Sequence, residues 1–145
     1  MSREYPPRPI AAVAATIIHE GKVLLAVRGN SPNKGKWGIP GGVIELGETT
    51  EQAVEREVFE ETNVVIKPKR LITIIDSIGK DSEGKIRTHY ILLEYLCEYI
   101  SGEVHAASDA PDARWFSLSE LVTLDMMTVT RDLVTRVARE EGFLP

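Results

Sequence analysis

Glutamates are crowded into one short stretch of the sequence, GGVIELGETTEQAVEREVFEETNVV, residues 41–65. The glutamates that share eleven consecutive positions are Glu51, Glu55, Glu57, Glu60 and Glu61. Like charges one helical turn apart repel each other, and Arg56 is the only cation of the expected helix. Carboxylates combined with a backbone carbonyl form a set of hard oxygen ligands that suits Mg²⁺ or Mn²⁺. A bound divalent cation would remove the repulsion, so the stretch predicts a metal site.

A solvated acidic face is the alternative interpretation, because glutamate is a good helix former. At about 100° per residue, Glu57, Glu60 and Glu61 fall within one third of the helix circumference. They flank an apolar stripe that contains Val54 and Val58 instead of lying opposite it, which brings at least one carboxylate close to the interior. Two adjacent glycines precede the helix and let backbone carbonyls approach a ligand. These features favour the metal site.

Local signals define the helix that carries the glutamates. Thr49 and Gln52 form a capping box, and neither glycine nor proline interrupts the chain through Thr62. A second, amphipathic helix is expected near the C-terminus in TVTRDLVTRVAREEG, with Val129, Leu133 and Val137 at i, i+4 spacing.

Four apolar runs predict the strands of a mixed sheet. IAAVAATII and KVLLAVR are separated by the turn HEG, and VVIKPKRLITIIDSI and RTHYILLEYLCEYI by the turn GKDSEGK, so two hairpins are expected. The segment GNSPNKGKW predicts a surface loop, and SGEVHAASDAPDARWF a loop that leads into a short strand.

Composition limits the classes of protein. With 145 residues and 43% apolar content, the chain is expected to form a single domain, residues 1–145. A net charge of −5 argues against a nucleic-acid polymer as partner. The one cysteine, Cys97, lies in an apolar run and is expected to be a buried thiol in a reducing compartment. The sequence shows neither a signal-peptide pattern nor 18 consecutive apolar residues, which predicts a cytoplasmic location without membrane contact.

At residues 42–64 the chain resembles the signature of the Nudix hydrolases, G-x5-E-x7-R-E-U-x-E-E-x-G-U, where U is a bulky aliphatic residue. The matching positions are Gly42, Glu48, Arg56, Glu57, Val58, Glu60, Glu61 and Val64. One position differs, because Asn63 stands where the family usually has glycine. Asparagine is the next residue best tolerated in a left-handed conformation, so the turn is expected to survive. Looser similarity to MutT-like and ADP-ribose pyrophosphatase-like members extends over most of the chain.

The resemblance implies an α/β (α+β) fold, an α/β/α sandwich with a mixed β-sheet and a loop-helix-loop catalytic motif. It also implies roles for individual residues. Glu57, Glu60 and Glu61 match the metal-binding carboxylates, with the carbonyl of Gly41 as a further ligand. The pair of Glu48 and Arg56 matches a salt bridge that braces the loop against the helix.

Two further assignments rest on position within the resemblance. Asp109, six residues before Trp115, stands where relatives carry an acidic metal ligand or general base, with Asp112 as a second candidate. The alternative for Asp109 is an ordinary polar loop residue. Arg28 resembles an arginine that relatives turn toward the substrate phosphate, and a solvated cation at a strand end is the alternative.

The implied function is a divalent-metal-dependent pyrophosphohydrolase that uses Mg²⁺, with Mn²⁺ as a substitute. It would cleave a nucleoside diphosphate linked to a group X, such as ADP-ribose or another NDP-sugar. A MutT-type (d)NTP pyrophosphohydrolase and a non-catalytic module that binds a nucleotide metabolite are the alternatives. The resemblance to ADP-ribose-cleaving relatives also implies a homodimer.

Overall fold

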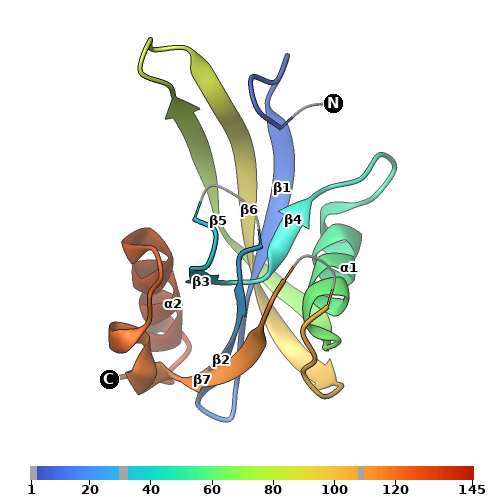
Figure 1. The fold of residues 1–145 in the computed structure, drawn as a ribbon. Coiled ribbons are helices and arrows are strands. Elements are labelled where there is room, and N and C mark those ends of the chain that lie inside the picture. Colours follow the sequence, from blue (N-terminus) through green and yellow to red (C-terminus); the bar gives the residue numbers. More distant parts are fainter. Residues whose placement is uncertain (1–2, 30–32, 108–109) are drawn as a thin grey trace.

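The computed structural model describes residues 3–29, 33–107 and 110–145 (Figure 1). Its strands are β1 (Ile10–His19), β2 (Lys22–Val27), β3 (Trp37–Gly38), β4 (Gly41–Val43), β5 (Val65–Lys80), β6 (Ile86–Ser101) and β7 (Ala113–Ser117). Its helices are α1 (Thr50–Thr62), α2 (Thr128–Glu140) and the short 3-10 helix η1 (Leu118–Thr123).

The strands form one mixed sheet, as the sequence predicted, and the structure gives its central order as β3-β2-β1-β6-β5, with β4 paired to β1 and β7 paired to β2. β1 and β6 are parallel, from Ile10 beside Tyr90 to Ile17 beside Cys97, whereas the other pairs are antiparallel. On its other edge, β1 pairs with β4 at residues 12–14 and with β2 only at its last two residues. β2 and β4 therefore pair with different parts of the same edge of β1. β4 is the last strand before α1 in the sequence.

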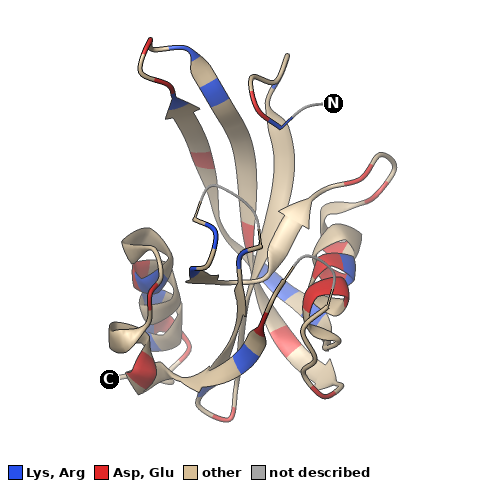
Figure 2. Cartoon of the chain, in the orientation of Figure 1, with Lys and Arg blue, Asp and Glu red and all other residues tan. Residues whose placement is uncertain are grey.

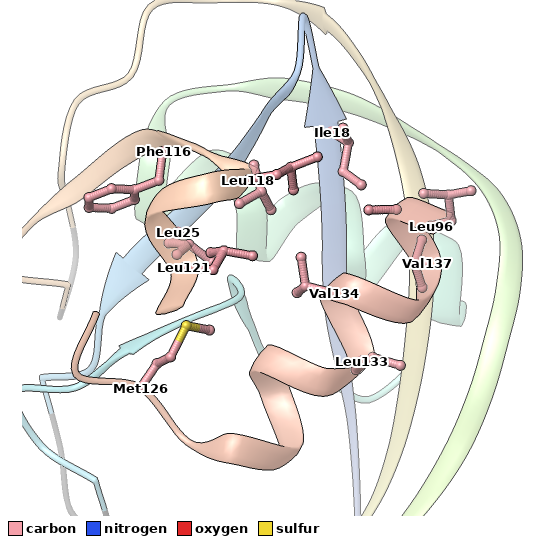
Figure 3. Packing of buried hydrophobic residues seen from close by; sticks show 12 residues of the cluster. Ile18, Leu25, Leu96, Phe116, Leu118, Leu121, Met126, Leu133, Val134 and Val137 are labelled. Carbon is pink, nitrogen blue, oxygen red and sulfur yellow. The ribbon is translucent and has the colours of Figure 1, made fainter. Parts of the chain in front are cut away.

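Helices α1 and α2 lie on opposite sides of the sheet, which confirms the predicted sandwich (Figure 1). Between α1 and the sheet, Val54 and Val58 pack with Val13, Ala15 and Ile17 of β1. A second cluster fills the α2 side and is drawn in Figure 3; its labelled members are Ile18, Leu25, Leu96, Phe116, Leu118, Leu121, Met126, Leu133, Val134 and Val137. Successive residues of a strand face opposite sides, so β1 supplies both clusters.

The local signals around α1 are confirmed. The side-chain oxygen of Thr49 accepts a hydrogen bond from the Gln52 backbone N–H at 3.1 Å, and the Gln52 side chain accepts one from the Thr49 N–H at 2.9 Å. Asn63 ends the helix with φ of 66°, in the left-handed region where glycine is otherwise preferred. The β1–β2 turn is also left-handed, at Glu20 and Gly21.

The predicted apolar stripe of α2 is wrong at one position. Leu133 and Val137 are buried, but Val129 is 56% exposed. The buried face continues through Val134 and Ala138, so it begins one turn later than predicted, and the first turn of α2 extends beyond the core.

Cys97 is buried, as predicted, with 2% of its surface exposed. Burial, together with the nearby carboxylates of Glu55 and Glu51, raises the pKa of this thiol to about 12. Across the described residues, neither α-helix has the length and apolarity that crossing a membrane would require.

Candidate active site

Arg56 belongs to the acidic helix α1, on which Figure 2 shows acidic and basic positions close together. Its Nε donates a hydrogen bond to Glu48 Oε2 at 2.5 Å, and its Nη2 donates to Glu48 Oε1 at 2.9 Å. Nη1 donates to Glu57 Oε1 at 2.9 Å and to Glu60 Oε2 at 3.1 Å. The predicted pair of Glu48 and Arg56 is therefore present, and the same guanidinium also neutralises part of the charge on two other glutamates.

The Glu48–Arg56 pair joins the loop to the helix. Two parallel hydrogen bonds from a guanidinium to a carboxylate fix both groups in orientation. Arg56 Nη2 also donates to the backbone carbonyl of Val43 at 3.1 Å, and the Glu45 N–H donates to Glu48 Oε1 at 3.0 Å. The end of β4, the loop after it and α1 are thus connected through one side chain.

These contacts shift the protonation equilibria of the pair. The hydrogen bonds from Arg56, followed by the one from the Glu45 N–H, lower the pKa of Glu48 to about 2. The hydrogen bond to Glu48 raises the pKa of Arg56 above its usual value. Both groups are therefore charged throughout the physiological range.

Glu57 and Glu61 are held against the glycine pair. The Glu57 carboxylate lies against the position that a β-carbon on Gly42 would take, so a larger residue there would force this carboxylate to move. Glu61 Oε2 accepts a hydrogen bond from the Gly41 N–H at 3.0 Å. The side chain of Glu57 is 16% exposed, compared with 47% for Glu60, so Glu57 is the inner carboxylate.

The donor atoms of this helix are of the type that suits a divalent cation. Carboxylate oxygens are ligands that Mg²⁺ and Mn²⁺ prefer. They lie here beside glycine backbone, which carries no side chain to block a ligand. Within the described residues, the structure shows no ready-made cluster of three or more metal-ligating side chains. The contacts explain this arrangement, because Glu57 and Glu60 are turned toward Arg56 while Glu61 is turned toward Gly41.

The loop after β6 docks against the end of α1. The His105 N–H donates to the Thr62 carbonyl at 2.9 Å, and the Ala107 N–H donates to the Glu61 carbonyl at 3.1 Å. This places the segment that leads to residue 109 beside the acidic helix. Asp109 itself lies outside the described residues. These backbone contacts were not foreseen, since they join segments about forty residues apart in sequence without a motif.

Of the other two candidates, Asp112 precedes β7 directly and contacts two residues of that strand. Its Oδ2 forms an ion pair with Nη2 of Arg114 at 2.6 Å, and its Oδ1 accepts a hydrogen bond from the Ala113 N–H at 2.8 Å. Arg28 is exposed directly after β2, and its backbone N–H donates to the Lys36 carbonyl at 2.9 Å. The structure therefore places Arg28 at the base of the loop that precedes β3.

The comparisons with known proteins agree on the family. The family model described as NUDIX domain matches residues 7–137, and the chain belongs to this family. Over 116 residues it is 40% identical to an ADP-ribose pyrophosphatase of Methanocaldococcus jannaschii. That similarity covers 80% of this chain and 66% of the archaeal relative, so the chain spans just under two thirds of the relative's length.

Two solved structures share the fold. A MutT Nudix hydrolase from Burkholderia pseudomallei superposes with a TM-score of 0.70 at 30% identity, covering 90% of this chain and 98% of that one. A bifunctional NMN adenylyltransferase/ADP ribose pyrophosphatase from Francisella tularensis, solved with AMP and a Mn ion, gives a TM-score of 0.72 at 29% identity. The second similarity covers 94% of this chain and 44% of the Francisella protein.

Proposed function

We propose that this protein is a divalent-metal-dependent pyrophosphohydrolase that cleaves the diphosphate of ADP-ribose or a closely related NDP-sugar. The observation that carries the proposal is the inner carboxylate, Glu57, which lies over Gly42 and is oriented by an arginine that is itself held by Glu48. The 40% identity to an ADP-ribose pyrophosphatase supports the choice of substrate.

In this proposal, Glu57, Glu60 and Glu61 hold the metal, together with the carbonyl of Gly41. When bound, Mg²⁺ or Mn²⁺ would neutralise the diphosphate, stabilise the leaving group and lower the pKa of an attacking water. Arg56 keeps Glu57 and Glu60 in place and offsets their mutual repulsion before the cation binds.

Two other residues are proposed to act on the substrate. Arg28, at the end of β2, would pair with a substrate phosphate through its charge. Asp109 would serve as a further metal ligand or as the general base that completes deprotonation of the water. The docking of residues 105 and 107 on α1 supports this role, since it brings the loop to the acidic helix.

A MutT-type reaction on a (d)NTP is the second candidate, and the similarity to the Burkholderia hydrolase supports it. The products separate the two reactions. Cleavage of ADP-ribose gives AMP and ribose 5-phosphate, whereas cleavage of a (d)NTP gives a nucleoside monophosphate and pyrophosphate. A module that binds the nucleotide without cleaving it would give neither.

The test is product analysis of the purified protein with ADP-ribose and with (d)NTPs, each with Mg²⁺, with Mn²⁺ and with chelator. We expect AMP from ADP-ribose only when a metal is present. Glu57→Gln should abolish turnover and retain the fold, while Glu55→Gln, an exposed position of the same helix, should retain activity. Full activity of Glu57→Gln would refute the assignment of the metal site.

A homodimer and a cytoplasmic location are proposed with this function. Light scattering of the purified protein at micromolar concentration checks the first, and cell fractionation checks the second. A mass of 16.1 kDa in solution would correspond to the monomer and would exclude the dimer.

A further inference from the structure

One carboxylate outside the acidic helix has no assigned role. Glu94 lies in the middle of β6, and 4% of its surface is exposed. Its Oε2 has no hydrogen-bond partner among the described residues, and the same is true of the buried Oγ1 of Thr16 in β1. The sequence contains a hint of this group, since Glu94 interrupts the apolar run YILLEYLC.

The register of the sheet brings the two polar groups to one face. Glu94 pairs with Ala14 of β1, and Thr16 pairs with Leu96, two residues after Glu94. Residues i and i+2 of a strand share a face, so Glu94, Leu96, Ala14 and Thr16 all face the α2 side of the sheet. Glu94 and Thr16 are therefore diagonal neighbours on adjacent strands.

The same register places Glu94 close to the candidate active site. Ala14 pairs with Glu94 on one edge and with Gly41 on the other, so the three residues form a row across β4, β1 and β6. Neighbouring strands lie about 4.8 Å apart, which puts the backbone of Glu94 roughly 10 Å from Gly41. A diphosphate held at Gly41, in this row of the sheet, would allow a ribose and a base to span the distance over the α2 side, on which Glu94 lies.

This face of the sheet becomes more exposed along β6 toward the β5–β6 hairpin. Leu92 and Tyr90, two and four residues before Glu94, share its face and are only partly buried. Glu94 therefore marks the inner end of a surface that opens toward the β5–β6 hairpin.

A purely structural role does not account for this carboxylate. Burying a polar group without a hydrogen-bond partner is unfavourable, and an aliphatic side chain would fill the same space without that cost. The residues that pair with Glu94 are Ala14 on β1 and Thr73 on β5, and neither carries a charge that could compensate it. Burial raises the pKa of the Glu94 carboxyl to about 7. In either protonation state, the group keeps an oxygen that can accept a hydrogen bond.

We propose that Glu94 positions the base of the substrate by accepting a hydrogen bond from the exocyclic amine of adenine, with the Thr16 hydroxyl as a second contact at the same inner end. The identity of the base rests on the proposed function, whereas the acceptor and its place in the sheet do not. A site built to pair with a donor discriminates against an analogue that lacks it, because its buried acceptor is then left without a partner.

The test measures binding without hydrolysis. AMP and purine riboside 5′-monophosphate, which lacks only the exocyclic amine, are titrated calorimetrically into the protein in the presence of chelator. For one hydrogen bond to a buried carboxyl, we expect wild type to bind AMP about tenfold more tightly than the analogue.

Three variants assign this preference to Glu94. Glu94→Leu should bind the two ligands equally, whereas Glu94→Gln should keep the preference, because its amide oxygen accepts the same hydrogen bond. Glu98→Leu makes the matched change at an exposed position of β6 and should behave as wild type. Circular dichroism checks the fold of each variant, and Glu94→Ala replaces Glu94→Leu if the latter does not fold.

Equal binding of the two ligands by wild type would overturn the proposal, as would a preference that persists in Glu94→Leu. Hydrolysis of ADP-ribose is measured separately. A protein that cleaves ADP-ribose but binds both ligands equally retains the proposed function and refutes the role of Glu94. One that prefers AMP but cleaves nothing retains the role of Glu94 and refutes the proposed function.

Discussion

Arg56 donates hydrogen bonds to three glutamates and to a backbone carbonyl at once. Its planar guanidinium can serve several acceptors in fixed directions, which the single ammonium group of lysine cannot do. The charge of Arg56 therefore matters less than its shape.

Arg56→Lys is accordingly expected to lower kcat/KM about 10- to 100-fold, the usual effect of removing a group that orients metal ligands. The fold should be retained, and the Mg²⁺ concentration needed for half-maximal activity should rise. Arg70→Lys is the control. Arg70 is an exposed residue that forms ion pairs with Glu140 and Glu141, and this substitution should leave kcat/KM unchanged. Wild-type activity of Arg56→Lys would show that charge alone is sufficient at this position.

Glu94 predicts a pH dependence of stability. Its carboxyl has a pKa of about 7 in the folded state and an ordinary value of 4.5, so the folded state keeps the proton to higher pH than the unfolded state. The stabilisation from this group is complete below pH 4.5 and is lost as pH rises through about 7. Glu94→Gln removes the titration and should be more stable relative to wild type at pH 8 than at pH 4.5, by about 3 kcal/mol.

Urea unfolding of wild type and Glu94→Gln at both pH values measures this difference. Glu98→Gln, at the exposed position on the same strand, should show no such change between the two pH values. A constant difference between Glu94→Gln and wild type would contradict the raised pKa.

Among the elements, α1 was predictable at both ends because the signals that define it are local. The capping box of Thr49 and Gln52 sets its start, and Asn63 sets its end through a backbone conformation that few residues adopt. Local chemistry of this kind does not depend on the rest of the fold. The buried face of α2 depends on where the core ends, which the sequence of the helix does not show. For this reason Val129 was wrongly predicted to be buried.

Substitutions of Asn63 test whether its left-handed conformation determines where α1 ends. Its φ of 66° is costly for a residue with a β-carbon, so Asn63→Ala should lower the free energy of unfolding by about 1 kcal/mol. Asn63→Gly should lower it less, because glycine accepts the conformation but loses the hydrogen bond from Nδ2 to the Glu103 carbonyl at 3.0 Å. Urea unfolding measures both, and equal stability of the two variants would contradict the conformational argument.

At the scale of the whole molecule, the sandwich and the mixed sheet could be predicted, but the arrangement that makes the candidate site could not. The row of Gly41, Ala14 and Glu94 depends on the pairing of three strands that are distant in the sequence. Periodicity identifies a strand without stating its neighbour or register. For the same reason, the docking of residues 105 and 107 on α1 could not be predicted from the sequence.

Because Cys97 is buried in the core, we predict that its thiol does not react with thiol reagents in the native protein. Burial raises the pKa of this thiol to about 12, and thiolate is the reactive form. We therefore expect no reaction with a thiol reagent at pH 8 in buffer and one equivalent of reaction in denaturant. Rapid labelling of the folded protein would show that the sheet opens beside β6.

The parallel pairing of β1 and β6 also affects how the chain acquires its structure during synthesis. Ile10 meets Tyr90 and Ile17 meets Cys97, so β1 leaves the ribosome long before its main partner is made. In that interval the strand pairings of the described residues that are available to the apolar segment IAAVAATII are the hairpin with β2 and the short pairing with β4. Pairings between distant segments form slowly, and exposed apolar strands aggregate. Nascent chains that stop before residue 86 are therefore expected to depend on chaperones, and longer ones to be released from them once β6 has formed.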